Sequence, residues 1–124
     1  MNKTQLYHSG VYDERIVNDL LALGDMEFIR ELIAIFKENT PNYLEELVQF
    51  YQERDAYGMR QVLHKMRGTC GTVGAKSMLA SVDALRKALV DIDWPETTFR
   101  LNEMKEVWSG TYPYLNLVFN LEDH

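Results

Sequence analysis

The sequence from Met59 to Gly74 reads MRQVLHKMRGTCGTVG. Its apolar residues recur at steps of three and four, which is the spacing of side chains along one face of an α-helix. These residues are Met59, Val62, Leu63, Met66, Cys70 and Val73. We therefore predict a helix that buries this stripe against the rest of the molecule.

His64 lies outside the apolar stripe. The positions that share its side of the predicted helix are Arg60, Arg67, Gly68 and Gly71, because residues three, four and seven apart are neighbours on a helix surface. This side would carry one imidazole, two guanidinium groups and bare backbone. Such a surface suits a site that receives a phosphoryl group in the open.

Helical spacing extends over almost the whole chain, and no segment alternates as a strand would. We expect residues 1–10 to form a loose arm and helices to begin near Asp13, Asp25, Asp55 and Asp93, since aspartate is a favoured N-cap. Thr40-Pro41 interrupts the second of these segments. Because proline removes an amide and clashes with the preceding turn, either a kink or a fresh start is compatible with the sequence there.

The sequence predicts an all-α fold in a single domain of residues 1–124. Its core is an antiparallel four-helix bundle, with an additional short helix near the N-terminus and a kinked C-terminal helix. Residues 109–113 should kink or interrupt that last helix before a short tail helix. The predicted apolar faces also include Leu23, Phe28 and Phe99.

Composition narrows the classes of function. Thirteen basic and nineteen acidic residues give a net charge of −6, which argues against a general nucleic-acid binder and leaves protein partners open. The single cysteine, Cys70, belongs to the apolar stripe and reads as a small buried residue rather than a reactive thiol. No apolar run reaches the roughly 18 residues that span a membrane, and the N-terminus lacks the apolar core of a secretion signal. We expect a cytoplasmic monomer.

Imidazole suits reversible phosphoryl transfer, because the neutral ring is a nucleophile near pH 7 and forms a high-energy N–P bond. Neighbouring guanidinium groups favour the neutral ring and then stabilise the phosphoryl dianion by charge-assisted hydrogen bonds. Arg67 is best placed for this role, with Arg60 one turn in the other direction. Gly68 would let a partner approach without meeting a side chain, and glycine inside a helix costs about 1 kcal/mol relative to alanine.

Other interpretations of the same residues are weaker. Gly68, Gly71 and Gly74 do not have the spacing of a phosphate-binding loop, and a helix rather than a strand precedes them. His8, His64 and His124 have no metal-ligand spacing, and no Cys-x-x-Cys pair is present. A surface histidine can also be incidental, with Gly68 marking a helix end that frays early.

The run His64-x-x-Arg67-Gly68-Thr69-x-Gly71-x-x-Gly74-Ala75 resembles the signature of histidine-containing phosphotransfer (HPt) domains. The resemblance extends from about Asp13 to Leu121 and includes Leu23-Gly24-Asp25, the Phe36…Thr40-Pro41…Leu44 segment and the Leu79…Leu85 stretch. It implies a four-helix bundle, a phosphorylated histidine at His64 and phosphate support from Arg67, where many members have lysine. It also implies a partner approaching at Gly68, and a polar contribution from Arg86 in the following helix. Lys65 stands where a neutral residue is common.

The resemblance implies a phosphoryl carrier that exchanges phosphate between His64 and an aspartate of response-regulator receiver domains. Its partners would be such receiver domains and a hybrid sensor kinase. Arg60, Lys65, Gly68, Gly71 and Arg86 would then bind the phosphate or the partner. No cofactor is expected, and no ATP site, so the chain would be a carrier and not a kinase. The alternative is a helical interaction module that binds a receiver without phosphotransfer.

Overall fold

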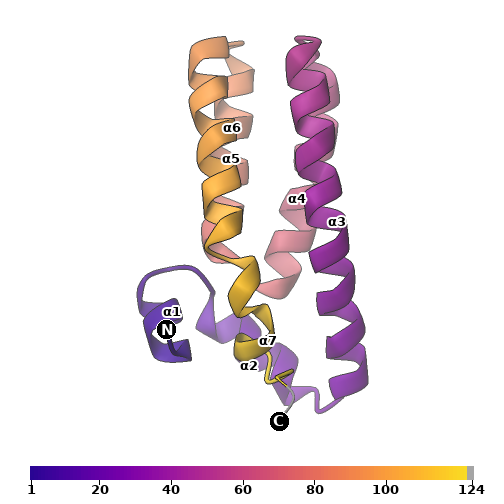
Figure 1. The fold of residues 1–124 in the computed structure, drawn as a ribbon, viewed down its shortest axis with the longest axis vertical. Helices are drawn as coiled ribbons and strands as arrows, with labels where there is room; N and C mark the ends of the chain where they lie inside the picture. Colours follow the sequence, from indigo (N-terminus) through magenta and orange to yellow (C-terminus); the bar gives the residue numbers. More distant parts are fainter. Residues whose placement is uncertain (123–124) are drawn as a thin grey trace.

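The computed structural model describes residues 1–122, which form helices joined by short turns and contain no strand. In chain order the elements are α1 (Lys3–His8), α2 (Glu14–Ala22), α3 (Met26–Gln52), α4 (Ala56–Val73), α5 (Lys76–Val90), α6 (Trp94–Ser109), the 3₁₀ helix η1 (Tyr112–Tyr114) and α7 (Leu115–Val118). The four long helices α3–α6 run side by side along the long axis of the molecule, and α1, α2 and α7 gather at one end (Figure 1). The predicted all-α fold is therefore confirmed.

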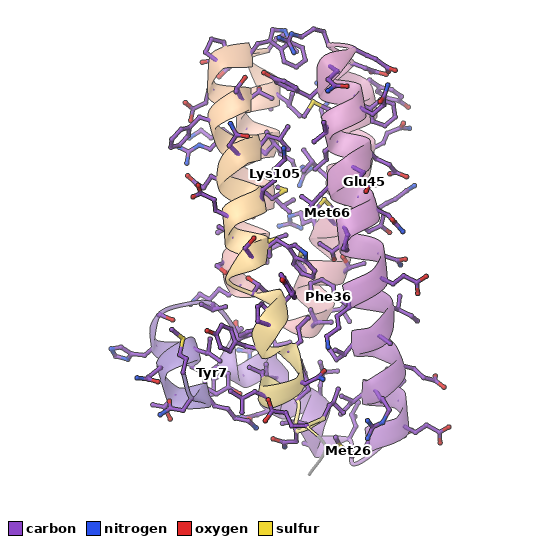
Figure 2. All side chains as sticks on the ribbon, viewed as in Figure 1. Tyr7, Met26, Phe36, Glu45, Met66 and Lys105 are labelled. Atoms are coloured by element: carbon purple, nitrogen blue, oxygen red, sulfur yellow. The ribbon has the colours of Figure 1, made fainter. Side chains whose placement is uncertain are left out.

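The four long helices form an antiparallel bundle around one hydrophobic core. Helix α4 packs against α3 and α5, and α5 packs against α6. Two aromatic pairs join α3 to α6, and both are packed edge to face. The ring centroids of Phe36 and Trp108 are 5.5 Å apart, and those of Tyr51 and Trp94 are 6.1 Å apart. Phe36 and Met66 lie between the helices (Figure 2), and both are almost fully buried.

Aspartate side chains begin four of the helices, as the sequence predicts. Backbone amides donate to the carboxylates of Asp13, Asp25, Asp55 and Asp93 at distances of 3.0, 3.0, 2.8 and 3.0 Å. Each of these bonds satisfies an amide that has no partner inside its helix, which stabilises a helix start by about 1 kcal/mol. The cap at Asp55 fixes the residue at which α4, the helix that carries His64, begins.

Helix α3 continues through Pro41 without a fresh start. The proline ring is on the exposed side of the helix, where water can reach the carbonyl that loses its amide partner. One residue earlier, the hydroxyl of Thr40 donates to the Phe36 carbonyl at 2.8 Å. Near the C-terminus the predicted interruption occurs: α6 ends at Ser109, and η1 and α7 follow.

The first ten residues are not a loose arm, and this part of the prediction is wrong. Residues 3–8 form α1, which begins with a reciprocal capping box between Asn2 and Gln5. Leu6 is fully buried, and the amine of Lys3 donates to the Asn120 side chain at 2.5 Å. A six-residue helix of this kind is stabilised mainly by such tertiary contacts. His124, considered above as a metal ligand, lies outside the described residues.

Three apolar side chains of the predicted faces are exposed. Leu23, Phe28 and Phe99 retain 64%, 44% and 57% of their accessible surface. Phe28 is on α3, Phe99 is on α6 and Leu23 is the C-cap residue of α2, and packing leaves a large part of each side chain open to water. Among the described residues, every helix is too short or too polar to cross a lipid bilayer.

Gly74 joins the end of α4 to the N-terminal segment. Its φ of +71° is left-handed, and its carbonyl accepts a hydrogen bond from the Asp13 amide at 2.8 Å. A Cβ at this position would lie 3.1 Å from Ile16 side-chain atoms. Both the backbone conformation and the close contact therefore require glycine here.

We predict that Gly74→Ala lowers the free energy of unfolding by about 1–3 kcal/mol, measured by urea denaturation. Gly68→Ala is the matched control, because Gly68 lies inside α4 and an added Cβ would meet nothing within 4 Å. That control should raise the free energy of unfolding by about 0.5–1 kcal/mol, since alanine is the better helix former. Equal effects of the two substitutions would contradict this account of the α4 terminus.

Candidate functional site

His64 lies on the exposed face of α4. The buried face of the same helix carries the predicted stripe, and all six of its residues are at most 3% exposed. His64, Gly68 and Gly71 are on the opposite side, where the imidazole is exposed. Within residues 1–122 the ring makes no hydrogen bond, so its nitrogens are open to an incoming group.

Gly68 and Gly71 leave the backbone of α4 bare beside His64. The helix continues through both positions to Val73, so neither glycine marks a frayed end. A Cβ at either position would meet nothing within 4 Å. The protein's own packing therefore gives no reason for glycine at two positions where it weakens the helix.

A groove of about 490 Å³ runs along the α3 side of His64. One wall is mainly apolar and comes from α3, including Leu32, Ile35 and Phe36. The other wall comes from α4 and includes His64 and Lys65. Ile35 is 54% exposed although it is a large aliphatic residue. The imidazole therefore borders an open groove with an apolar wall, and sequence periodicity alone did not reveal this groove.

The arginines of α4 extend toward α5. The Nε of Arg67 donates to the Asp83 carboxylate at 3.0 Å, and an Nη of Arg60 donates to the Leu89 carbonyl at 3.5 Å. Neither guanidinium hydrogen-bonds to His64. Sequence analysis places both arginines on the same side of α4 as His64, and the structure adds that each contacts an acceptor on α5.

The ion pair between Arg67 and Asp83 is weak. The two side chains are 53% and 49% exposed, and the contact joins Nε to a single carboxylate oxygen. Pairs of this exposure stabilise a protein by about 0–1 kcal/mol, because water and salt screen the charges. Arg67 can therefore leave Asp83 at small cost.

Arg86 and Lys65 complete the charged surroundings of His64. Arg86 is on α5, with an Nη 4.0 Å from the same Asp83 oxygen that Arg67 contacts. Lys65 is exposed on the groove side and has no ion-pair partner within residues 1–122. The α4 residues Arg60, Lys65 and Arg67, together with Asp83 and Arg86 of α5, thus form a surface with more basic than acidic side chains on a chain of net charge −6.

Asp83 is the charged residue of this surface that sequence analysis missed. Its three-residue separation from Arg86 indicates a pair within α5. The stronger contact, with Arg67 sixteen residues away, depends on how α4 and α5 are aligned. No spacing rule within one helix reports that alignment.

Cys70 is buried and does not belong to the exposed surface. Burial raises the pKa of its thiol to about 12, and a hydrogen bond involving Thr69 offsets part of that effect. The thiolate is the reactive form of cysteine, so this thiol is unreactive at neutral pH. The predicted structural role of Cys70 is consistent with its position in the core.

We predict that the free energy of unfolding falls as the pH rises from about 9 toward 12. The ionisation of Cys70 in the unfolded chain contributes up to about 1.4 kcal/mol per pH unit to this fall. The sign follows because the thiol ionises near pH 9 in the unfolded chain but stays neutral to about pH 12 when folded. The Cys70→Ala variant is the control and should show a shallower slope. Identical slopes for the two proteins in urea denaturation would contradict the burial argument.

Comparison with known proteins places this geometry in a family. The sequence model of the Hpt domain matches residues 31–110, which run from α3 to the end of α6. The chain belongs to the Hpt family. Hpt domains are phosphocarriers and not kinases, and they work with response-regulator and kinase partners in phosphorelays.

A solved structure has the same fold as this Hpt chain. It is the X-ray structure of a rice protein described as a histidine-containing phosphotransfer protein, with a TM-score of 0.84 and 15% sequence identity. The match covers 95% of this chain and 88% of the rice chain. It therefore includes the helices on either side of the Hpt match. A search of curated proteins found no match.

Proposed function

We propose that this Hpt chain carries a phosphoryl group on His64 and exchanges it with an aspartate of response-regulator receiver domains. The observation that carries the proposal is the bare helix backbone at Gly68 and Gly71 beside an exposed imidazole. Two glycines that the fold itself does not need are explained if another protein must come close to His64. Family membership supplies the chemistry that this approach would serve.

The proposed transfer is a single in-line displacement. A neutral imidazole nitrogen of His64 forms a bond to phosphorus while the bond between phosphorus and the receiver's aspartate oxygen breaks. The aspartate leaves as a carboxylate, and the proton on the other ring nitrogen passes to solvent. In the return direction the same carboxylate attacks phosphorus and the imidazole leaves, after taking a proton from solvent.

The charges around His64 suit the transferred group. A phosphoryl dianion is bound best by cations and N–H donors, and α4 carries Arg67, Lys65 and Arg60 within four positions of His64. These cations favour an anion rather than Mg²⁺ at this surface. We therefore assign the Mg²⁺ of the transfer to the receiver domain, where it would neutralise the phosphoryl oxygens from the other side.

The groove between α3 and α4 supports a role of this surface in binding the receiver, in addition to its role in phosphoryl transfer. Its apolar wall at Leu32 and Ile35 adjoins His64, so a receiver that reached the imidazole could bury these side chains. In this proposal a hybrid sensor kinase is a further partner, which exchanges phosphate with the chain through its receiver. The chain acts as a cytoplasmic monomer that moves between such partners.

A transfer assay tests the proposed function. A panel of receiver domains, phosphorylated with labelled acetyl phosphate and freed of donor, is incubated with the chain. At least one receiver should pass label to the chain in a form that acid removes and alkali does not, which is typical of phosphohistidine. Complex formation without any transfer would instead favour the interaction module that binds receivers without phosphotransfer.

A further inference from the structure

Asp83 lies at the edge of the His64 surface, between two arginines. Arg67 Nε donates to Asp83 Oδ1 at 3.0 Å, and Arg86 Nη1 lies 4.0 Å from the same oxygen. Within residues 1–122, Asp83 is the one carboxylate that pairs with a cation of this surface. The contact with Arg67 crosses from α5 to α4, so it connects a cation one helical turn from His64 to the neighbouring helix.

Arg67 can reach either Asp83 or a group on the His64 ring. Residues three apart on a helix have Cβ atoms about 5–6 Å from each other, and arginine has a long, flexible stem. Asp83 offers one negative charge and, in this contact, one oxygen on a half-exposed side chain. A phosphoryl group offers nearly two negative charges and three oxygens. The phosphoryl group is therefore the stronger partner for Arg67.

We propose that Asp83 holds Arg67 while His64 is unmodified and shares it with the phosphoryl group once His64 is phosphorylated. Asp83 is then a positioning residue that limits the lifetime of phosphohistidine, because it competes with phosphate for Arg67. This inference depends on the proposed function, with His64 as the phosphorylated residue.

The direction of the effect follows from the hydrolysis reaction. Phosphoryl transfer to water passes through a loose, metaphosphate-like transition state. The phosphoryl oxygens carry less negative charge in that state than in phosphohistidine, so a bound guanidinium stabilises phosphohistidine more than the transition state. Releasing Arg67 from Asp83 should therefore slow hydrolysis.

Phosphohistidine lifetimes in a mutant cycle test the inference. The full chain is phosphorylated with phosphoramidate, the donor is removed, and the phosphohistidine signal is followed by ³¹P NMR. We expect Asp83→Asn to lengthen the lifetime about threefold or more, and Arg67→Ala to shorten it by a similar factor. In the Arg67→Ala background, Asp83→Asn should change the lifetime by at most about 1.5-fold. Asp83→Glu retains the charge and should stay near the wild-type lifetime.

The side chain of Arg67 gives a readout that a purely structural role would not change. In the wild-type chain, the Arg67 Nε–Hε resonance should move when His64 is phosphorylated, because Nε changes its acceptor. In Asp83→Asn the same resonance should already differ before phosphorylation. The missing peak in Arg67→Ala assigns the resonance, and thermal unfolding reports whether each variant is folded.

Any of three results would overturn this inference and leave the proposed function standing. They are equal lifetimes for all Asp83 variants, an Arg67 resonance that does not move on phosphorylation, and an effect of Asp83→Asn that is as large in the Arg67→Ala background as in the wild-type chain. The last result would show that Asp83 acts only through its charge. If the folded wild-type chain forms no phosphohistidine at His64, both the proposed function and this inference fail. That outcome is distinct, because no variant would then give a signal to compare.

Discussion

Replacing His64 by glutamine is expected to abolish phosphoryl acceptance from a phosphorylated receiver. Glutamine keeps a polar side chain of similar length, but its amide nitrogen has no lone pair available to attack phosphorus. The fold should be retained, since His64 is exposed and surface substitutions usually change stability by less than about 0.5 kcal/mol. The measurement is label incorporated per folded protein after incubation with the receiver.

His8→Gln is the matched control for this substitution. His8 is also exposed, but it lies at the end of α1, away from the His64 surface. This control should accept label at the wild-type rate. Label in His64→Gln at the wild-type level would remove His64 from the reaction.

The second large effect is expected at Gly68. Gly68→Gln places a side chain on the surface where we propose that the receiver approaches, and we expect the transfer rate to fall by about tenfold or more. The same substitution should raise the free energy of unfolding by about 0.5–1 kcal/mol, because glutamine is the better helix former. A variant that is more stable and yet slower would separate the role of Gly68 in docking from any role in folding.

Ser109→Gln controls for the added side chain. Ser109 is exposed at the end of α6, a helix that does not border the His64 groove. Its transfer rate should match the wild-type rate. If Gly68→Gln also transfers at that rate, the receiver docks elsewhere.

Much of the fold could be predicted from local sequence signals. The stripe from Met59 to Val73 is buried as expected, because helical periodicity reports which side of a helix is apolar. The starts of α2, α3, α4 and α6 follow from aspartate caps, which act within three residues of sequence. The exposure of His64 follows from the same two signals.

Features that depend on contacts distant in sequence could not be predicted. Helix α1 is only six residues long and depends on the burial of Leu6 and on Lys3 reaching Asn120. The path of α3 through Pro41 depends on which side of the bundle the proline faces. Phe28 and Phe99 carry the apolar signal of a core residue, but no neighbouring helix covers them.

The same limit applies to the site. Its α4 residues lie within eleven positions of each other, and one helix determines their arrangement. The pairing of Arg67 with Asp83 and the groove wall at Ile35 come from neighbouring helices. Charge and spacing on α4 predict which cations share the helix side of His64, but not which acceptors on α5 they contact.

Mapping the phosphorylated residue on the chain determines whether His64 is the phosphoryl acceptor. The chain is incubated with a phosphorylated receiver, digested under alkaline conditions and mapped by tandem mass spectrometry. Because the sequence contains three histidines, His8, His64 and His124, the map distinguishes the proposed acceptor from the other two. We expect a phosphoryl group on the His64 imidazole and on neither of the other two histidines. A phosphoryl group on His8, on His124 or on a side chain other than histidine, with His64 unmodified, would contradict this expectation.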